Sequence, residues 1–362
     1  KMAGNYPNAY EMTSRFEGVV KYYRATGKPE VKQMLDNYYN NISTREITII
    51  GNGGADQPYH PKVMGEAWDN TALEQTSPDI KRMMETCVGV TWMKFCSQMM
   101  RLTGESSPVD QIEKYIYNGL LGAMKPTGDG FSYVNLLNGK KVNDSGWGRH
   151  FDHLHVTCCN LSGPIGLSYI PYIAVTNSDQ GPVVNLYNAA EVTTTTPSGQ
   201  ALKITIDTDY PQSGKIVIGV KSHKPERYAI QLRIPEWSKK NVVKVNGKKH
   251  DVTPGRYAVI DREWKSNDRI EIGFEMVCRI IEAPRGSNRK GDNFEAATWG
   301  PIVLARDENI DPDYNQQIKV KADRRGIVKV AKTTPTRDDA RMEFIVPTTT
   351  GTIRMVDYAS VN

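Results

Sequence analysis

The sequence has no hydrophobic run that approaches the ~20 consecutive apolar residues of a membrane-spanning helix. It also has no runs of one charge, because a net charge of +5 is dispersed over 362 residues. Without a basic stripe, nothing favours binding to a nucleic acid or to a membrane surface, and we expect neither partner. With 39% hydrophobic and 24% charged residues, the composition is that of a soluble globular chain long enough for two domains.

Cysteine is scarce. The five cysteines are Cys87, Cys96, Cys158, Cys159 and Cys278, and this odd number with uneven spacing does not indicate a disulfide framework. The pair in "HVTCCNLSGP" is adjacent in sequence, whereas ordinary disulfide geometry requires Cα atoms farther apart than neighbouring residues lie. A metal site or a nucleophile therefore explains the adjacent thiols better than a structural bridge.

The N-terminal segment "KMAGNYPNAY" lacks both an initiator context and the apolar region of a signal peptide, and we expect the chain to be a fragment. Localisation cannot be read from such a start. The bacterial periplasm and the cytoplasm are the compartments that we expect.

The first half of the sequence has apolar residues at helical spacing. A helix is predicted within 10–26 with Gly27 as its stop, and a second helix is predicted to begin at Pro29. The turn "RATGKPEVKQ" is echoed by "RLTGESSPVDQ" 77 residues later, which indicates repeated helical hairpins. Hairpins of this kind are typical of a helical toroid or solenoid, in which no single hairpin buries its apolar face alone.

Near residue 175 the pattern changes to period two. Short alternating runs such as "ALKITIDTDYP", "GKIVIGVKS" and "DRIEIGFEMV" are separated by Gly, Pro, Asn and Asp, as in an antiparallel β-sandwich. The sequence therefore predicts a multidomain α-then-β protein, with helices in residues 1–175 and β-sandwich domains in residues 176–362.

The nearest candidates to act with Cys158 and Cys159 lie in "METCVG". A predicted amphipathic helix begins there and leaves Glu85 and Cys87 at its N-terminal end. Three thiolates and one carboxylate are a plausible tetrahedral zinc set. From spacing alone, two interpretations stay open: a zinc site, or buried cysteines that are chemically inert. The second interpretation suits Cys96 and Cys278 well.

Several motifs resemble glycoside hydrolase family 127, the β-L-arabinofuranosidase family. In the helical half they are "GEAW" (65–68), "ETC" (85–87), "YNGLLGAM" (117–124), "YVN" (133–135) and "CC" (158–159). In the strand half they are "LRIPEWS" (232–238), "VNGK" (245–248) and "WGPIVLA" (299–305). The resemblance implies that residues 1–175 are the C-terminal part of an (α/α)6 barrel catalytic domain, a partial barrel that is followed by the β-sandwich.

The resemblance also implies retaining glycosidase chemistry with a zinc-bound cysteine nucleophile. By the motifs, Cys158 is the nucleophile, Glu85, Cys87, Cys158 and Cys159 hold Zn²⁺, and Glu66 is the acid/base. A retaining glycosidase usually has two carboxylates, and here a thiolate replaces the nucleophilic one. Without the motif, Glu66 would be interpreted as a solvated loop carboxylate.

The resemblance further implies an oligosaccharide or polysaccharide substrate that carries β-L-arabinofuranose or a related furanosyl sugar, and leaves a homodimer open. Asn8 takes the position where family members tend to carry a sugar-contacting histidine. Trp68 and Tyr133 are further candidates for sugar contact, with packing as the alternative. Two other functions stay open: the same chemistry on another pectic sugar, and a non-catalytic carbohydrate-binding protein with a structural zinc site.

Overall fold

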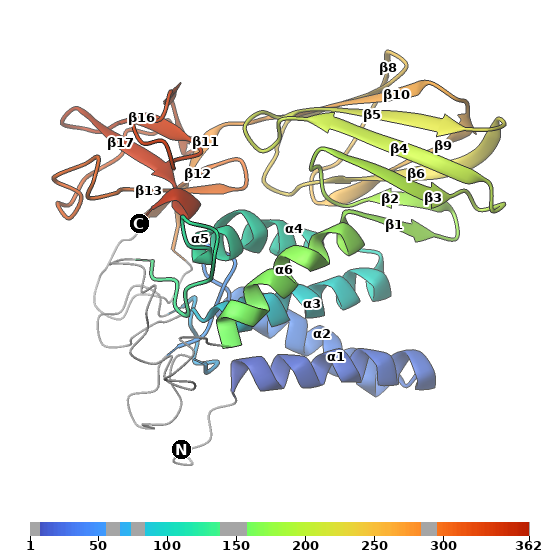
Figure 1. Ribbon diagram of the computed structural model, residues 1–362, viewed down its shortest axis with the longest axis horizontal. Helices are drawn as coiled ribbons and strands as arrows, with labels where there is room; N and C mark the ends of the chain where they lie inside the picture. The colour runs from blue at the N-terminus through green and yellow to red at the C-terminus, as the bar shows by residue number, and fades with distance from the viewer. Residues whose placement is uncertain (1–7, 56–65, 74–83, 138–157, 284–294, 362) are drawn as a thin grey trace. The chain divides into compact units, whose positions relative to one another are not determined.

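The computed structural model describes residues 8–55, 66–73, 84–137, 158–283 and 295–361 (Figure 1). The chain divides into two compact units. Unit 1 comprises Lys1–Leu102, Gln111–Ser168 and Val277–Asn362, and unit 2 comprises Thr103–Asp110 and Tyr169–Met276. Among the described helices, none combines the length and the apolar content that crossing a bilayer requires.

Helices come first along the chain, as the periodicity predicts. They are α1 (Ala9–Thr26), α2 (Pro29–Arg45), α3 (Thr86–Thr103), α4 (Ser107–Lys114), the π-helical η1 (Tyr115–Leu120), α5 (Leu121–Ala123) and α6 (Cys158–Ala174). The predicted change from helix to strand is confirmed, because α6 ends at Ala174 and β1 begins at Val175.

The repeated Thr-Gly turn has a simple backbone cause. Gly27 follows α1 with φ 64°, and Gly104 follows α3 with φ 68°, so both glycines adopt the left-handed conformation that ends a helix. Pro29 then opens α2 with its backbone already suited to a first helical turn. The predicted stop, start and echo are therefore confirmed.

Aromatic side chains pack between the helices of unit 1. The ring of Tyr38 on α2 stacks on Phe16 of α1 and meets Phe95 of α3 edge to face. The Tyr38 hydroxyl accepts a hydrogen bond of 3.1 Å from the indole of Trp68. This cluster ties the segment that carries Glu66 to the first three helices.

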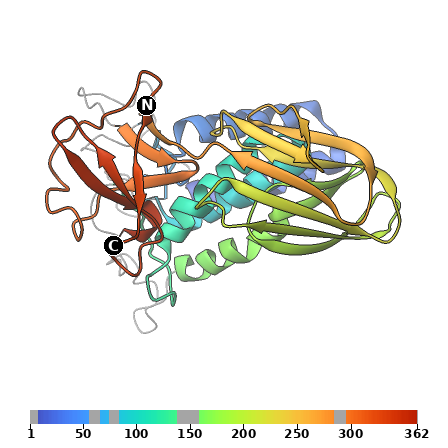
Figure 2. The same cartoon turned by 90° about the horizontal axis from the view of Figure 1, so that it is seen from above.

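Unit 2 contains two sheets, drawn as facing layers in Figure 1 and seen from above in Figure 2. The four-stranded sheet has the order β1-β2-β6-β9, with β1 at Val175–Ser178, β2 at Gly181–Val184, β6 at Glu226–Ile234 and β9 at Arg256–Trp264. The six-stranded sheet has the order β3-β4-β5-β10-β7-β8, with β3 at Ala190–Thr195, β4 at Ala201–Thr208, β5 at Lys215–Ser222, β10 at Asp268–Phe274, β7 at Asn241–Val245 and β8 at Lys248–His250.

The alternation predicted for these strands is visible in their burial. In β4 and β5 every second residue is buried, and the register pairs Ile206 with Ile218 and Ile204 with Val220. One face of the sheet thus forms an apolar layer while the other carries the charged residues.

A buried arginine connects the sheets of unit 2 to the first turn of α4. Arg233, whose side chain is fully buried, donates to Asp110 at 2.6 Å and to the backbone oxygen of Asn185 at 2.6 Å. The hydroxyl of Tyr187 donates back to the carbonyl of Arg233 at 2.6 Å. The arginine of the "LRIP" motif is therefore a paired structural group.

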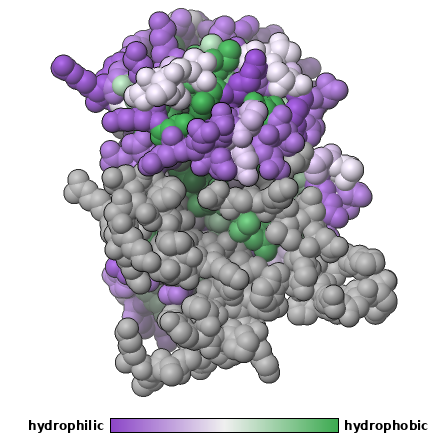
Figure 3. Space-filling model, turned by 90° about the vertical axis from the view of Figure 1, so that its left-hand side faces the viewer, coloured by the Kyte–Doolittle hydropathy of each residue, from purple (hydrophilic) through white to green (hydrophobic). Residues whose placement is uncertain are grey.

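Unit 1 also contains a C-terminal sheet of order β14-β11-β12-β13-β17-β16-β15. The strands are β11 (Cys278–Glu282), β12 (Glu295–Trp299), β13 (Ile302–Ala305), β14 (Ile327–Val328), β15 (Ala331–Thr333), β16 (Glu343–Pro347) and β17 (Thr352–Asp357), followed by the 3-10 turn η3 (Tyr358–Ser360). The described surface over this sheet is mostly hydrophilic on the face in Figure 3.

The C-terminal sheet contacts the helices through buried groups. Asn118 of η1 donates to the carbonyl of Pro301 at 2.9 Å and accepts from the amide of Val303 at 2.8 Å. Tyr358 packs against Ile50 and Val303 in one buried cluster. The last 86 residues therefore belong to the same compact unit as the helices, from Val277 to Asn362.

These contacts predict that Asn118→Ala weakens unit 1. The substitution leaves the Pro301 carbonyl and the Val303 amide without their partner in a buried place, and the free energy of unfolding should fall by about 2–4 kcal/mol. Urea unfolding followed by circular dichroism measures this. Asn37→Ala, at an exposed position of α2, is the control and should change it by less than about 0.5 kcal/mol. Equal stabilities of Asn118→Ala and the unchanged chain would contradict the shared unit.

Candidate active site

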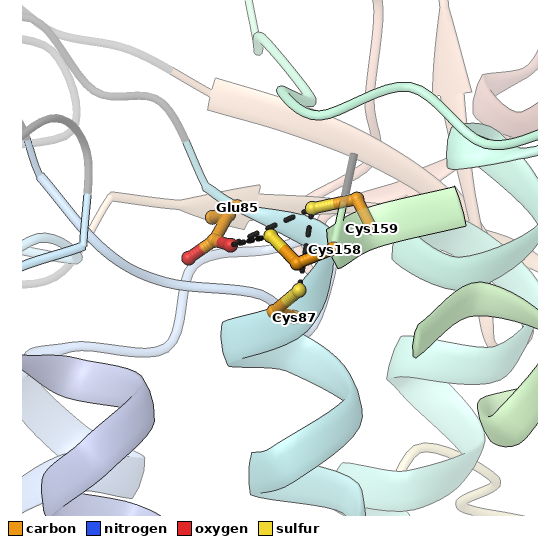
Figure 4. A group of neighbouring side chains, drawn as sticks. All are labelled: Glu85, Cys87, Cys158 and Cys159. Carbon is orange, nitrogen blue, oxygen red and sulfur yellow. Dashed lines mark hydrogen bonds between the residues drawn. The ribbon is translucent and has the colours of Figure 1, made fainter. Parts of the chain in front are cut away.

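Four ionisable side chains converge at the first turns of α3 and α6 (Figure 4). Glu85 and Cys87 come from the start of α3, and Cys158 and Cys159 are the first two residues of α6. One donor atom from each residue lies within 4.8 Å of the other three. Residues that are more than 70 positions apart in the sequence thus form one group that could hold a metal ion.

The distances within this group are short but not covalent. Cys87 Sγ lies 3.4 Å from Cys159 Sγ. Glu85 Oε1 lies 3.5 Å from Cys159 Sγ and 3.7 Å from Cys158 Sγ. A disulfide needs about 2.05 Å between its two sulfur atoms. The sulfur atoms of this group lie farther apart, and all three cysteines are free thiols.

A buried asparagine fixes the chain just before α3. Met84 has a left-handed φ of 43°, and the amide of Asn52 donates to the carbonyls of both Met84 and Glu85, at 2.8 and 3.1 Å. Glu85 also forms a β-bridge with Val134, beside the bond of 3.1 Å from the Thr86 amide to the Tyr133 carbonyl. The Glu85 backbone is therefore held from two sides.

Two glycines allow aromatic rings to press against the helix starts. A Cβ at Gly89 would lie 2.2 Å from the ring of Tyr115, whose hydroxyl donates to the Thr86 carbonyl at 3.0 Å. A Cβ at Gly163 of α6 would lie 2.2 Å from the ring of Phe131. Larger residues at either position would push α3 or α6 away, so the glycines set the distance between the two pairs of donors.

Asn160 fixes the first turn of α6 from the other side. Its side-chain oxygen accepts a bond of 2.8 Å from the backbone amide of Phe131. The residue after the adjacent cysteines therefore has a structural role, and so does Asn52. Sequence reasoning missed both, because a single asparagine carries no periodic or motif signal.

Burying these ionised side chains costs free energy unless a cation compensates their charge. Glu85, Cys87 and Cys159 are buried, and only Cys158 is exposed. Burial raises the pKa of the Glu85 carboxyl well above its usual value and raises the pKa of the Cys159 thiol. Glu85 Oε2 is buried and accepts no hydrogen bond within the described part of the chain. Buried, unsatisfied oxygen of this kind suits a metal ligand.

The pKa values of the exposed Cys158 thiol and the buried Cys87 thiol shift in opposite directions. Hydrogen bonds from Cys159 and Cys87 lower the pKa of the Cys158 thiol to about 3. Donating to Cys158 raises the pKa of the Cys87 thiol. Cys87 at the start of α3 and the adjacent cysteines at the start of α6 also lie at helix N-termini, where the backbone amides favour a thiolate.

Glu66 lies on a short bridged segment and is held at both carboxylate oxygens. Its Oε2 accepts a bond of 2.8 Å from the amide of Asn8, and its Oε1 accepts a short bond from the Tyr133 hydroxyl. The next residue, Ala67, forms β-bridges with both Asn8 and Ala55. The alternative of a freely solvated loop carboxylate does not describe this side chain.

Tyr133 connects Glu66 with the four-donor group. Its hydroxyl contacts Glu66, its carbonyl lies 3.9 Å from Cys159 Sγ, and its ring packs in one buried cluster with Cys87 and Cys159. Burial raises the pKa of the Tyr133 hydroxyl, which keeps it protonated as a donor. Sugar contact by Tyr133 stays a prediction.

The remaining predicted residues have packing partners. Trp68 is 6% exposed and donates its indole N–H to Tyr38 at 3.1 Å, so its sugar contact also stays a prediction. Cys96 and Cys278 are buried and are not part of the four-donor group. His150, His153 and His155, which precede the cysteines, lie outside the described residues.

Two family models match this chain. Residues 6–170 match the β-L-arabinofuranosidase GH127 catalytic domain, and residues 182–276 match the GH127 middle domain. Together the matches include every residue of the site, and they divide where helices give way to strands.

A curated relative and two solved structures are similar to the chain. The non-reducing end β-L-arabinofuranosidase of Bifidobacterium longum subsp. longum is 23% identical over 309 residues, which cover 82% of this chain and 45% of the relative. The crystal structure of Ara127N-Se, a GH127 β-L-arabinofuranosidase from Geobacillus stearothermophilus T6, has a TM-score of 0.79 at 21% identity and covers 98% of this chain and 58% of that one. The GH127 β-arabinofuranosidase BT3674 has a TM-score of 0.77 at 23% identity and covers 98% and 57%. The chain thus spans about half the length of these proteins.

The four-donor group predicts about one tightly bound metal ion per chain when the protein is purified under reducing conditions. Cys87→Ser should lower the metal content severalfold, because it replaces a soft thiolate with a weakly binding hydroxyl. Elemental analysis of the purified protein measures this. Cys96→Ala, on the same helix but outside the group, is the control and should retain the metal. A folded, reduced chain without metal would contradict the assignment.

Proposed function

The chain belongs to glycoside hydrolase family 127, and on this basis we propose that it is a retaining glycoside hydrolase that releases β-L-arabinofuranose, or a related furanosyl sugar, from plant cell-wall glycans. One observation carries the proposal: an exposed thiol, Cys158, sits in a cluster of buried donors linked through Tyr133 to the hydrogen-bonded carboxylate of Glu66. An oligosaccharide or polysaccharide is the proposed partner.

Zinc is the metal that we propose for Glu85, Cys87, Cys158 and Cys159. In a tetrahedral zinc site, ligand bonds of about 2.0–2.3 Å separate two sulfurs by about 3.8 Å and a sulfur from an oxygen by about 3.5 Å. The distances of 3.4, 3.5 and 3.7 Å in the group are close to these values. Soft thiolates also favour zinc over magnesium or calcium. When bound, zinc would keep the thiols ionised and hold Cys158 in place.

In the first step, Glu66 acts as the acid and Cys158 acts as the nucleophile. Glu66, protonated, gives its proton to the glycosidic oxygen as the bond from that oxygen to the anomeric carbon breaks. The lone pair of the Cys158 thiolate forms a bond to the anomeric carbon, and the leaving alcohol departs with the proton from Glu66. The product is a thioglycosyl enzyme with Glu66 ionised.

The second step restores both groups. The Glu66 carboxylate takes a proton from water while the water oxygen bonds to the anomeric carbon. The bond from carbon to Cys158 Sγ breaks, and the electron pair returns to sulfur as thiolate. Two displacements at the same carbon give net retention of configuration. Cys158 suits the nucleophile role because it is the exposed member of the four, whereas Cys87 and Cys159 are buried.

We propose that residues 1–175 form the C-terminal part of an (α/α)6 barrel catalytic domain and that residues 176–362 supply the β-sandwich domains. The repeated hairpins and the catalytic-domain match over 6–170 support this division. The C-terminal sheet packs on the helices within unit 1, so it would support the proposed barrel domain.

The proposed roles predict two different failures. Cys158→Ala removes the nucleophile, so hydrolysis should fall by at least about 10⁴-fold even for an aryl glycoside with a good leaving group. Glu66→Gln removes proton transfer, so an alkyl glycoside should lose about 10²–10⁴-fold in kcat, whereas an aryl glycoside should still show a first-step burst. Stopped-flow release of the aryl alcohol measures both.

The chain offers a matched control for the cysteine change. Cys96→Ala removes a buried thiol from α3 without touching the four-donor group and should keep the rate within about threefold. Near-full activity of Cys158→Ala would mean that the adjacent cysteines are metal ligands only and that neither is the nucleophile. A screen of aryl furanosides and pectic oligosaccharides then identifies the sugar, and no hydrolysis of any by the metal-loaded chain would favour a non-catalytic carbohydrate-binding protein.

A further inference from the structure

The side-chain amide of Asn8 can point in only one direction. As the N-cap of α1, Asn8 accepts a bond of 2.8 Å from the backbone amide of Glu11. A backbone N–H is a donor, so the atom that receives it must be the amide oxygen. The amide nitrogen therefore faces the other way, 2.8 Å from Oε2 of Glu66.

The same helix start also holds the backbone of Glu66. The amide of Ala9, the first residue of α1, donates a short bond to the Glu66 carbonyl, and Asn8 forms a β-bridge with Ala67. Both the main chain and the side chain of Glu66 are thus fixed to one helix turn. A movement of this turn would move the carboxyl group with it.

The two partners of Glu66 have different hydrogen-bonding abilities. An amide nitrogen can only donate, so Oε2 must stay an acceptor whether Glu66 is ionised or neutral. The Tyr133 hydroxyl at Oε1 can donate to a carboxylate or rotate to accept from a carboxylic acid. Asn8 consequently directs the proton of neutral Glu66 to Oε1.

We infer that Asn8 is the positioning residue of the acid/base: it orients Glu66 through the N-cap of α1 and assigns the transferable proton to Oε1. This inference rests on the proposed role of Glu66. It gives Asn8 a task inside the protein, with both polar atoms of its amide already engaged, in place of the sugar contact expected from the sequence.

The titratable groups around Glu66 come from α1, from the starts of α3 and α6, and from the segment that carries Tyr133. Tyr133 contacts it directly, Glu85 at the start of α3 interacts with it electrostatically, and Cys158 of α6 acts on Tyr133. Glu11 lies on α1 itself and is exposed. Because these groups are unchanged in variants of Asn8, differences between the variants report on the amide.

Two variants keep the helix cap and remove the amide donor. Asn8→Ser and Asn8→Asp can both accept from the Glu11 amide, so α1 should still begin at the same place. Serine removes the bond to Glu66 without adding charge, whereas aspartate adds a negative charge beside it. Both changes favour the neutral form of Glu66 over the ionised form, and this preference should grow in the order unchanged chain, Asn8→Ser, Asn8→Asp.

Glu66 acts first as an acid, so a variant that favours its neutral form stays active at higher pH. The basic limb of the kcat/KM profile should move to higher pH in the same order. For an alkyl glycoside, kcat should fall about 10-fold in Asn8→Ser while KM changes less than about threefold. Glu11→Gln, which alters the same helix turn without touching Glu66, is the control and should leave the profile in place.

A second measurement is independent of activity. In ¹³C-glutamate-labelled chain, the carboxyl signal of Glu66 is identified by its absence from Glu66→Gln, and its titration gives the pKa directly in each variant. If the titration shifts as expected while no substrate is hydrolysed, the inference about Asn8 stands and the proposed function fails. Unshifted titrations in both variants overturn the inference about Asn8. A large rise in KM with unchanged kcat also overturns it, because that result would indicate a sugar contact.

Discussion

The architecture of the site depends on one electrostatic constraint: a carboxylate and two thiols are buried together in unit 1, around Glu85, Cys87 and Cys159. Like charges cannot be buried side by side unless protons or a cation compensate them. The fold accordingly brings two helix N-termini to the same point and leaves one oxygen of Glu85 without a protein partner. A metal ion satisfies all of these requirements at once.

The constraint also explains the rigid surroundings. Asn52 holds the left-handed turn before α3, Tyr115 presses on Gly89, and Phe131 presses on Gly163. Each contact acts on backbone rather than on the ionisable side chains themselves. The donors are thus placed by helices whose first turns cannot shift independently. Tyr133 extends this rigidity to Glu66, because its carbonyl is bonded to the start of α3 while its hydroxyl holds the carboxylate.

Much of this could be predicted from local sequence. Gly27 and Pro29 marked the turn between α1 and α2, and alternation indicated the strands of unit 2. The donor group of Glu85, Cys87, Cys158 and Cys159 was left open by spacing alone and was implied by the family motifs. Other features were not accessible. The packing of the C-terminal sheet on the helices rests on contacts such as Asn118 with Val303, which are 185 residues apart and leave no periodic signal.

The central claim is that Cys158 forms a covalent bond with the sugar while the rest of the group holds the metal. Peptide mapping by mass spectrometry tests it most directly, with Glu66→Gln incubated with an aryl β-L-arabinofuranoside and quenched in acid while the second step is slow. The account predicts the mass of one pentosyl group on the peptide that contains Cys158, assigned to this sulfur by fragmentation. A pentosyl group on a carboxylate, or rapid sugar release with no adduct on any residue, would contradict it.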